Sequence, residues 1–592
     1  MKLKTKSVGK KDSRKKDFLT RANELGEKAG DHFSTMFIQR LKNVREVRLW
    51  VVEWVLLVLV VFLLAIVQII WYSSSYETTA FTEGGEYIEA TLGEVKSMNP
   101  LYATTNAEKT LSRLLFANLV SPDISGHIGM DLAESVKMDE TGKVWTVTLR
   151  DGIKWSDGEP ITADDIIYTV GLIEDDSAKT TISADFARIK LEKTDDRTVV
   201  FTLPSVYLDF EDTLEFPLLP SHILGDVKPA VVYEHAFSSD PICSGPFKYK
   251  AVQNGGGNNR YTQMIYLDRN EKYYGSKTKL NSFILKTYNS TDKIADALRD
   301  STVQATAESL TDNDINVNHR TTLTNGGVFA FLNTQSATLK SVALRQAIQR
   351  GVDMSKVREG LDEMRAMDYP FLQEQEPGLQ YPALAANSID DAKKILAENK
   401  YYFDEDGKLF DESGANVTIN ISVRKREPIQ SVAQRFAKEL ENLGITVVMN
   451  VFDDTQPNMD FFAQVVRPRD YDILFYEVDL GVSADPFIFY SSTQANSAGW
   501  NFSNYNNALA DDALLTARTT LDANLRTSKL NAFLQRWVNE VPAIGIYRSA
   551  VDYYYQDNLQ IFSENAKFTD AFDRFNDVEY WAINRTAVMQ TP

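Results

Sequence analysis

A continuous apolar run over residues 54–72 predicts a helix that spans a membrane. The run contains a single polar amide, Gln68, and no ionisable side chain before its last residue. At ~1.5 Å per residue, a helix of this length matches the ~30 Å hydrocarbon core of a bilayer. Trp50 and Trp71 stand at its two ends, where aromatic rings suit the headgroup interfaces. A buried helix of a soluble core is the alternative, but such helices rarely run this long without a polar face. We therefore expect a span over residues 50–72.

Charge on the two sides of this run predicts an orientation. Residues 1–49 carry fourteen Lys and Arg against six Asp and Glu, whereas the whole chain has a formal charge of −19. The positive-inside rule predicts that this basic segment is cytoplasmic and that the acidic remainder is extracellular. A cleaved signal peptide is disfavoured by the long basic lead and by the lack of an A-x-A site. A lipid anchor is disfavoured because the single cysteine, Cys243, lies far downstream. We expect an uncleaved signal anchor in the lipid bilayer over residues 50–72, followed by a polar linker over residues 73–83.

Beyond this linker, hydrophobic periodicity predicts an α/β fold. The pattern indicates strands over residues 86–92 and 143–150 and a helix over residues 106–117. A strand over residues 417–423, a helix over 428–443 and a strand over 445–451 form a βαβ unit, so a parallel pair is expected. Residues 472–477 read as one more strand. Ligands of open α/β sheets bind beyond the C-terminal ends of strands, which points at the loop over residues 478–487.

Composition narrows the class of protein. The chain is 43% hydrophobic and 11% aromatic, as in globular proteins. The roughly 520 residues after the apolar run are enough for two to four domains. One cysteine excludes an intrachain disulfide. The acidic balance argues against nucleic acid as a partner.

Catalytic and metal-binding motifs are scarce. The chain has no P-loop, no G-x-S-x-G and no H-E-x-x-H. Its five histidines lack the spacing of a metal site. S-x-x-K occurs at residues 276–279 and 290–293, but no K-T-G or S-D-N accompanies it. We expect no catalytic residue, no metal site and no cofactor, and therefore not an enzyme.

Several motifs resemble one family in order and in spacing. WTVTLRDGIKWSDGEPITADDIIYTVG over residues 145–171 resembles the signature of the family 5 extracellular solute-binding proteins, the oligopeptide- and dipeptide-binding receptors of ABC importers. SGPFK at residues 244–248, RNEKYYG at residues 269–275 and FAFLN at residues 329–333 follow in the family's order. The resemblance extends over about residues 84–562.

This resemblance implies a two-lobed α/β fold of the periplasmic-binding-protein type (type II) with an extra subdomain, here preceded by one transmembrane helix. It divides the chain into lobe I (84–102, 220–274 and 500–592), the extra subdomain of lobe I (103–219) and lobe II (275–499). The crossings near Gly275 and Gly499 would form the hinge. The implied function is a membrane-anchored receptor that captures peptides between its lobes by hinge closure and delivers them to the permease transmembrane subunits.

The family's binding loop departs from its usual pattern here. An Asp four residues before the Pro of a D/E-P pair commonly holds the peptide α-amine in this family. The pair in this chain is Asp485-Pro486, and Val482 stands at the expected position. Asp479 or Asp485 is the candidate replacement, although Asp479 is also compatible with a solvated loop position and Asp485 with a helix cap. The departure leaves room for a non-peptide solute such as a sugar or a metal chelate.

Five more residues are candidates for ligand contact. Trp500 is placed either to stack on a ligand or to close the hinge core. Asn106 and Asn333 offer side-chain amides. Ser244 and Gly245 belong to the glycine-containing turn of the family pattern.

Two other functional classes stay open. Residues 18–47 have helical periodicity, which fits either an amphipathic helix on the inner leaflet or a juxtamembrane stalk. A ligand sensor that signals through this cytoplasmic segment is one alternative function. An extracellular hydrolase is the other, and the lack of catalytic motifs disfavours it.

Overall fold

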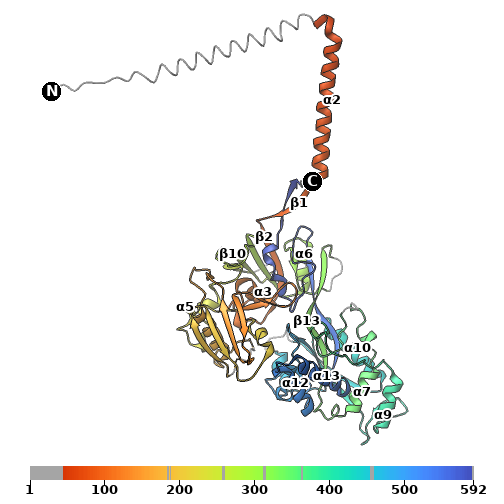
Figure 1. Ribbon diagram of the computed structural model, residues 1–592. Coiled ribbons are helices and arrows are strands. Elements are labelled where there is room, and N and C mark those ends of the chain that lie inside the picture. Colours follow the sequence, from red (N-terminus) through yellow and green to blue (C-terminus); the bar gives the residue numbers. More distant parts are fainter. Residues whose placement is uncertain are drawn as a thin grey trace, which may run out of the picture. The chain divides into compact units, whose positions relative to one another are not determined.

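The structure is a computed structural model that describes residues 44–182, 186, 188–255, 261–310, 315–361, 365–453 and 459–589 (Figure 1). Its contacts divide the chain into two compact units. One unit is residues 81–584, and the other combines the first 80 residues with residues 585–592. The helix expected within residues 18–47 lies almost wholly outside the described residues.

One long helix dominates the smaller unit. α2 (Val44–Tyr76) is 33 residues long. Within it, Leu49–Tyr72 is the one stretch of the described chain that is long and apolar enough to cross a membrane, and none of it is buried against protein. These bounds agree with the span predicted over residues 50–72.

The segment after this stretch is regular, although a linker was predicted over residues 73–83. Its first residues complete α2, and β1 (Glu77–Thr82) follows directly. β1 pairs with β20 (Asn584–Met589) in a two-stranded sheet. The prediction of a plain linker was wrong because the strand that pairs with it lies at the far end of the chain, which local composition does not reveal.

The larger unit is built on one ten-stranded mixed sheet. In spatial order its strands are β17 (Thr446–Phe452), β16 (Thr418–Arg424), β18 (Ile473–Asp479), β13 (Asn318–Leu332), β19 (Ala543–Tyr555), β12 (Ala305–Thr306), β2 (Glu86–Leu92), β11 (Ser282–Tyr288), β10 (Gln263–Arg269) and β9 (Phe247–Asn254). β16 and β17 run parallel, as the βαβ pattern predicted.

Helices contribute buried side chains to the hydrophobic cores of the larger unit. They are α3 (Asn106–Leu115), α6 (Thr291–Arg299), α7 (Val342–Gly351), α8 (Met354–Val357), α9 (Ile389–Glu398), α10 (Ile429–Asn442), α11 (Phe487–Tyr490), α12 (Ala508–Thr519) and α13 (Ala523–Glu540). In α10, Val432, Phe436 and Leu440 are fully buried at the expected helical spacing. A reciprocal capping box between Thr105 and Glu108 begins α3.

Two long strands run through both halves of the sheet. β13 and β19 pair with each other, with a break in register between Leu323 and Gly327. Past the break β13 pairs with β18, whereas the end of β19 pairs with β12. A side chain at Gly326 would meet Ser549 at 3.0 Å, so glycine permits the close approach of the two strands there. The lobes are therefore joined by β13 and β19, and not near Gly275 and Gly499 as predicted.

Two segments also pack in the opposite lobe from the predicted one. β11 falls inside the predicted lobe II, yet it pairs in parallel with β2, and Phe283 and Leu285 lie in the core of the first lobe. α12 and α13 fall inside the predicted lobe I, yet they pack with Phe329 and Phe331 in the second lobe. Both differences arise from pairings between segments far apart in sequence, which a periodicity does not encode. The remaining boundaries stay a prediction.

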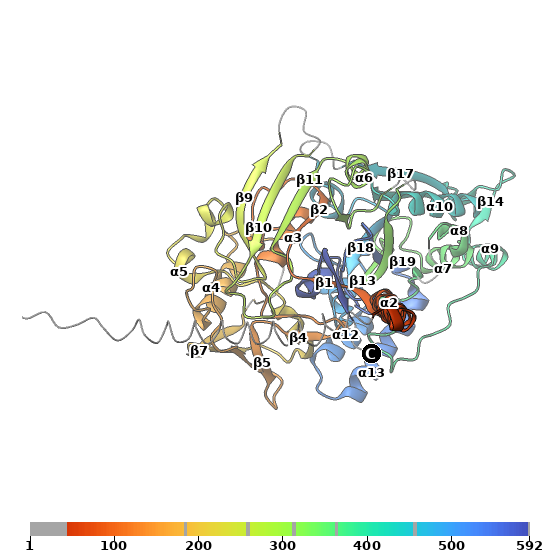
Figure 2. The same cartoon turned by 90° about the horizontal axis from the view of Figure 1, so that it is seen from above.

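The segment predicted as the extra subdomain contains its own sheet. Its strands, in spatial order, are β5 (Ala133–Met138), β6 (Val144–Leu149), β8 (Thr198–Thr202) and β7 (Lys190–Asp195), and the two-stranded pair β3 (Val120–Pro122) and β4 (Ile128–Met130) lies beside it in sequence. α4 (Ala163–Glu174) begins with a capping box of Thr162 and Asp165. In both views the short helix α5 (Ser221–Leu224) lies on the opposite side of the unit from α9 and α10, and Figure 2 shows α4 on the same side as α5.

Candidate ligand-binding site

The loop that follows β18 lies beside three cavities. The central cavity, about 300 Å³, is lined at residues 477–479. The side cavity, about 560 Å³, is lined by residues within 479–488, and a third cavity, about 660 Å³, by residues 482–484. Asp479 lines both the central and the side cavity. The C-terminal end of β18 is therefore next to open space on more than one side, which is where a ligand of an open α/β sheet binds.

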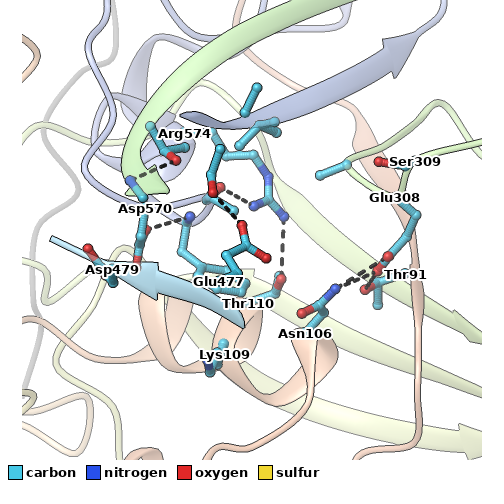
Figure 3. A pocket seen from close by; sticks show the side chains of 18 of the residues that line it. Thr91, Asn106, Lys109, Thr110, Glu308, Ser309, Glu477, Asp479, Asp570 and Arg574 are labelled. Atoms are coloured by element: carbon cyan, nitrogen blue, oxygen red, sulfur yellow. Dashed lines mark hydrogen bonds between the residues drawn. The ribbon is translucent and has the colours of Figure 1, made fainter. Parts of the chain in front are cut away.

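The walls of the central cavity come from both halves of the sheet. Its charged and polar lining residues are Thr91, Asn106, Lys109, Thr110, Glu308, Ser309, Thr324, Arg426, Glu477, Asp479, Ser549, Thr569, Asp570 and Arg574. β2 and α3 supply one side, and β18 and Arg426, which follows β16, supply the other. Figure 3 shows Asp479 and Asp570 toward one end of the cavity and Asn106, Thr91 and Glu308 toward the other. A solute held here would contact both lobes.

Asp479 is a cavity carboxylate with few partners in the protein. Its Oδ1 accepts a hydrogen bond from the Gly481 N–H at 2.8 Å. The side chain is exposed in the open cavity. The protein around it removes part of its hydration, and this desolvation, with a smaller contribution from the negative charge of Asp570, raises the pKa of Asp479 to about 6. No cation of the described residues lies within 4.0 Å of it, so a cationic group of a ligand would relieve an unfavourable charge.

At the other end of the cavity, Glu308 is held by neutral donors. Thr91 Oγ1 donates to it at 2.8 Å, the Leu92 N–H at 3.0 Å and Asn106 Nδ2 at 3.1 Å. The residue is 7% exposed. These bonds fix Asn106 with its amide nitrogen turned toward Glu308, so that Asn106 helps to orient a cavity carboxylate.

The nearest fully buried cation is already paired. Arg574 Nη2 contacts Glu89 Oε1 at 2.7 Å, and both side chains are almost fully buried. Arg574 also donates to Thr110 Oγ1 at 3.4 Å. Lys109 lies over the ring of Phe572 at 5.8 Å. The cavity therefore keeps more negative than positive charge available to a ligand.

Asp485 has a different environment from Asp479. Its Oδ2 faces Arg518 Nε at 3.3 Å and accepts from Tyr207 Oη at 3.4 Å. Its Oδ1 accepts from the Phe487 N–H at 3.2 Å, at the start of α11. Asp485 lines the side cavity, but its carboxylate is occupied by protein groups.

The remaining predicted residues lie within packed or hydrogen-bonded protein. Trp500 packs on Phe462 and Phe502, with ring centroids 6.0 and 5.6 Å away. Asn333 is 6% exposed and donates to the carbonyl oxygen of Tyr471 at 3.0 Å. Neither residue lines the central cavity.

Ser244 and Gly245 serve the packing of α3. The N–H groups of both residues donate to the Leu115 carbonyl oxygen, at 3.0 and 2.8 Å. Ser244 Oγ accepts from the Ala117 N–H at 3.0 Å. A Cβ at Gly245 would lie 2.7 Å from the Leu115 carbonyl carbon, so the turn needs glycine for close approach. The structure thus brings Asp479 and Asn106 to one cavity and leaves Trp500, Asn333, Ser244 and Gly245 outside it.

Sequence reasoning missed Glu308, Asp570 and Arg574. None of the three residues lies within the quoted family motifs, and no local sequence pattern marks any of them. The parallel pairing of β12 with β2, which brings residue 308 next to residue 91, is the signal that would have identified Glu308. In the described part of the chain, no group of three His, Cys, Asp or Glu side chains is placed to hold a metal ion.

Comparisons with known proteins show the family of this chain. Residues 127–500, more than half of the chain, match the model for bacterial extracellular solute-binding proteins, family 5 (middle). The oligopeptide-binding protein AppA of Bacillus subtilis is 26% identical over 526 residues, which is 84% of this chain and 92% of that protein.

Solved structures share the fold. AppA of Bacillus subtilis, in complex with a nonapeptide, aligns with a TM-score of 0.68 at 22% identity and covers 85% of this chain and 100% of its own. NikZ of Campylobacter jejuni, in complex with Ni(L-His), aligns with a TM-score of 0.68 at 22% identity, over 84% and 99% of the two chains. The predicted two-lobed α/β fold is confirmed. The family consists of solute-binding proteins of ABC transporters and not of enzymes. The chain belongs to the family 5 bacterial extracellular solute-binding proteins.

Proposed function

We propose that this protein is the membrane-anchored substrate-binding protein of an ABC importer and that it captures peptides in the central cavity. The observation that carries the proposal is the Asp479 carboxylate. It lines the cavity that both lobes border, its pKa is raised to about 6, and the described residues provide no cation within ion-pair distance. A peptide α-ammonium supplies that missing charge.

The polar lining of the cavity suits the rest of a peptide. Asn106, Ser309 and Thr91 place amide and hydroxyl groups along it, and such groups pair with peptide N–H and carbonyl groups. Asp570 adds a second negative charge near Asp479. The name of AppA, an oligopeptide-binding protein, supports the same class of ligand.

Closure follows from the position of the site. Because the cavity walls belong to both lobes, a bound ligand gains contacts with each of them and shifts the population toward the closed form. β13 and β19 are the strands about which this movement takes place. The closed receptor then docks on the permease and delivers its cargo.

The anchor and its orientation belong to the same proposal. Leu49–Tyr72 spans the membrane, the basic residues before it stay in the cytoplasm, and residues 81–584 lie outside the cell. Tethering keeps the receptor at high effective concentration near its transporter.

A non-peptide cationic solute is the second candidate. Val482 stands where the family resemblance expects the amine-binding carboxylate, and the fold neighbour NikZ was solved with Ni(L-His). The same carboxylates, Asp479 and Asp570, serve such a ligand.

Native mass spectrometry of the full-length chain in detergent tests the proposal. We expect a set of peptide masses that appears only after denaturation of the complex. A single non-peptide mass would replace the first candidate by the second. Titration with Leu-Ala-Ala-Ala-Ala by calorimetry covers the case of an empty protein, and no binding of this peptide would contradict peptide capture.

A further inference from the structure

The side cavity differs from the central cavity in its chemistry. Its lining includes the apolar side chains of Leu203, Pro204, Val206, Leu480, Ile488 and Leu515. Its volume of about 560 Å³ exceeds that of the central cavity and lies within the range of small-molecule sites. Charged residues also border this cavity. Whether they are already paired with protein groups decides how polar the cavity is for a ligand.

Those charged residues are mostly satisfied by protein. Asp485 faces Arg518 at 3.3 Å, and Glu215 faces Arg113 Nη2 at 2.6 Å. Asp212 accepts from the Ser483 N–H at 3.0 Å, and burial raises the pKa of Asp212 to about 6. A guest in the cavity thus meets mainly aliphatic surface.

Asp479 borders both this apolar space and the central cavity. It is the residue that lines both cavities. Leu480, the next residue, lines the side cavity but not the central cavity. A group attached to the carbon beside a bound ammonium therefore has the side cavity within reach.

The two walls of the side cavity belong to different parts of the fold. Residues 203–215 come from the segment predicted as the extra subdomain, and residues 479–488 with α12 come from the second lobe. Polar contacts join the walls: Asp212 to the Ser483 N–H, and Tyr207 to Asp485. An apolar group between the walls would contact both and add to the closure of the receptor.

We propose that the side cavity is a specificity subsite that takes a large apolar side chain on the residue that carries the ammonium bound by Asp479. The inference rests on the proposed function and adds to it the class of ligand, namely peptides with an aliphatic or aromatic first residue. Burial of a leucine side chain raises affinity by roughly ten- to hundredfold over glycine at that position.

Calorimetry on the full chain in detergent, with two pentapeptides, tests the proposal. Leu-Ala-Ala-Ala-Ala should bind at least about tenfold more tightly than Gly-Ala-Ala-Ala-Ala. In Leu515→Gln this preference should fall to about threefold or less, while affinity for the glycine peptide stays within about twofold.

Leu509→Gln is the matched control. Both leucines lie on α12 and are exposed, at 53% for Leu515 and 60% for Leu509, but only Leu515 lines the cavity. Equal binding of the two peptides by the native chain would overturn the subsite while leaving peptide capture intact. So would a preference that Leu515→Gln retains as fully as Leu509→Gln. Failure of both peptides to bind would overturn the proposed function, and the subsite with it.

Discussion

Asp479 and Asp485 stand six residues apart in one loop, and the fold gives them opposite surroundings. Asp485 meets Arg518, the Tyr207 hydroxyl and the Phe487 N–H. Asp479 accepts from one backbone N–H, and its charged neighbours are the carboxylates of Asp570 and Asp573 and the more weakly acting ammonium of Lys109. The carboxylate of Asp485 is therefore paired within the protein, whereas that of Asp479 has no protein cation within ion-pair distance.

The roles of Asp485 and Asp479 therefore differ because distant segments supply partners to Asp485, and the sequence of the loop does not show this. Arg518 comes from α12, and Tyr207 from a segment before the second lobe begins. Local sequence offers either aspartate as a ligand contact. Only the assembled fold shows which carboxylate is already satisfied.

The largest expected effect is on affinity when Asp479 is neutralised. Asp479→Asn should weaken binding of Leu-Ala-Ala-Ala-Ala by about 2–4 kcal/mol, roughly 30- to 1,000-fold, because an ammonium loses its enclosed counter-charge. Calorimetry on the full chain measures it. Binding within threefold of the native chain would contradict the assignment of Asp479.

The next effect is on stability, and it belongs to the other aspartate. Asp485→Asn removes the charge that Arg518 faces and weakens the cap of α11, so the free energy of unfolding should fall by about 1–3 kcal/mol. Thermal unfolding followed by circular dichroism measures the change. Asp479→Asn serves as the control and should not lower the melting temperature, since it removes an uncompensated charge.

A smaller effect is expected from pH. The raised pKa of Asp479, about 6, means that the free protein binds a proton more readily than an ordinary Asp, and this proton competes with the ligand cation. Affinity should therefore be full at pH 7.5 and fall by about tenfold at pH 5. Titrations at both pH values test this. The dependence should vanish in Asp479→Asn, and a pH profile that persists in that variant would move the titrating group elsewhere.

The smallest effect is expected at Trp500. Since its ring packs on Phe462 and Phe502 and does not line the central cavity, Trp500→Leu should change peptide affinity by less than about twofold. The same calorimetric titration measures it. A loss comparable with that of Asp479→Asn would return Trp500 to the ligand-binding residues.

The local sequence pattern predicted individual helices and strands, but it did not predict which distant strands pair with each other. The strand at residues 86–92, the helix that begins at residue 106 and the parallel βαβ unit depend on neighbours in sequence, and the structure has all of them. The lobe assignment of β11 depends on its pairing with β2, about 200 residues earlier. A hydrophobic strand gives no sign of which distant strand it will join.

The candidate site shows the same division. The strand-end rule led to the loop that contains Asp479 because it needs only the order of local elements. Glu308 and Asp570 join that cavity from the end of β12 and from the C-terminal region, and no motif marks either of them. Asn333 looked like an exposed amide after a strand, but its side chain bonds to the Tyr471 carbonyl oxygen inside the second lobe. The assignment of ligand contacts stays a proposal until the titrations are made.

The segment that connects the apolar stretch to the larger unit is short, and part of it lies in α2 and β1. Eight residues, 73–80, separate the end of the apolar stretch at Tyr72 from the start of the larger unit at Phe81. Even fully extended they would reach only about 26–29 Å, and helix and strand take up part of that length. In the proposed anchored receptor, so short a connection would confine residues 81–584 to a thin layer above the membrane. Lateral diffusion of two membrane proteins would then govern its encounters with the proposed transporter, so the rate of delivery should follow their density in the bilayer and not the volume outside the cell.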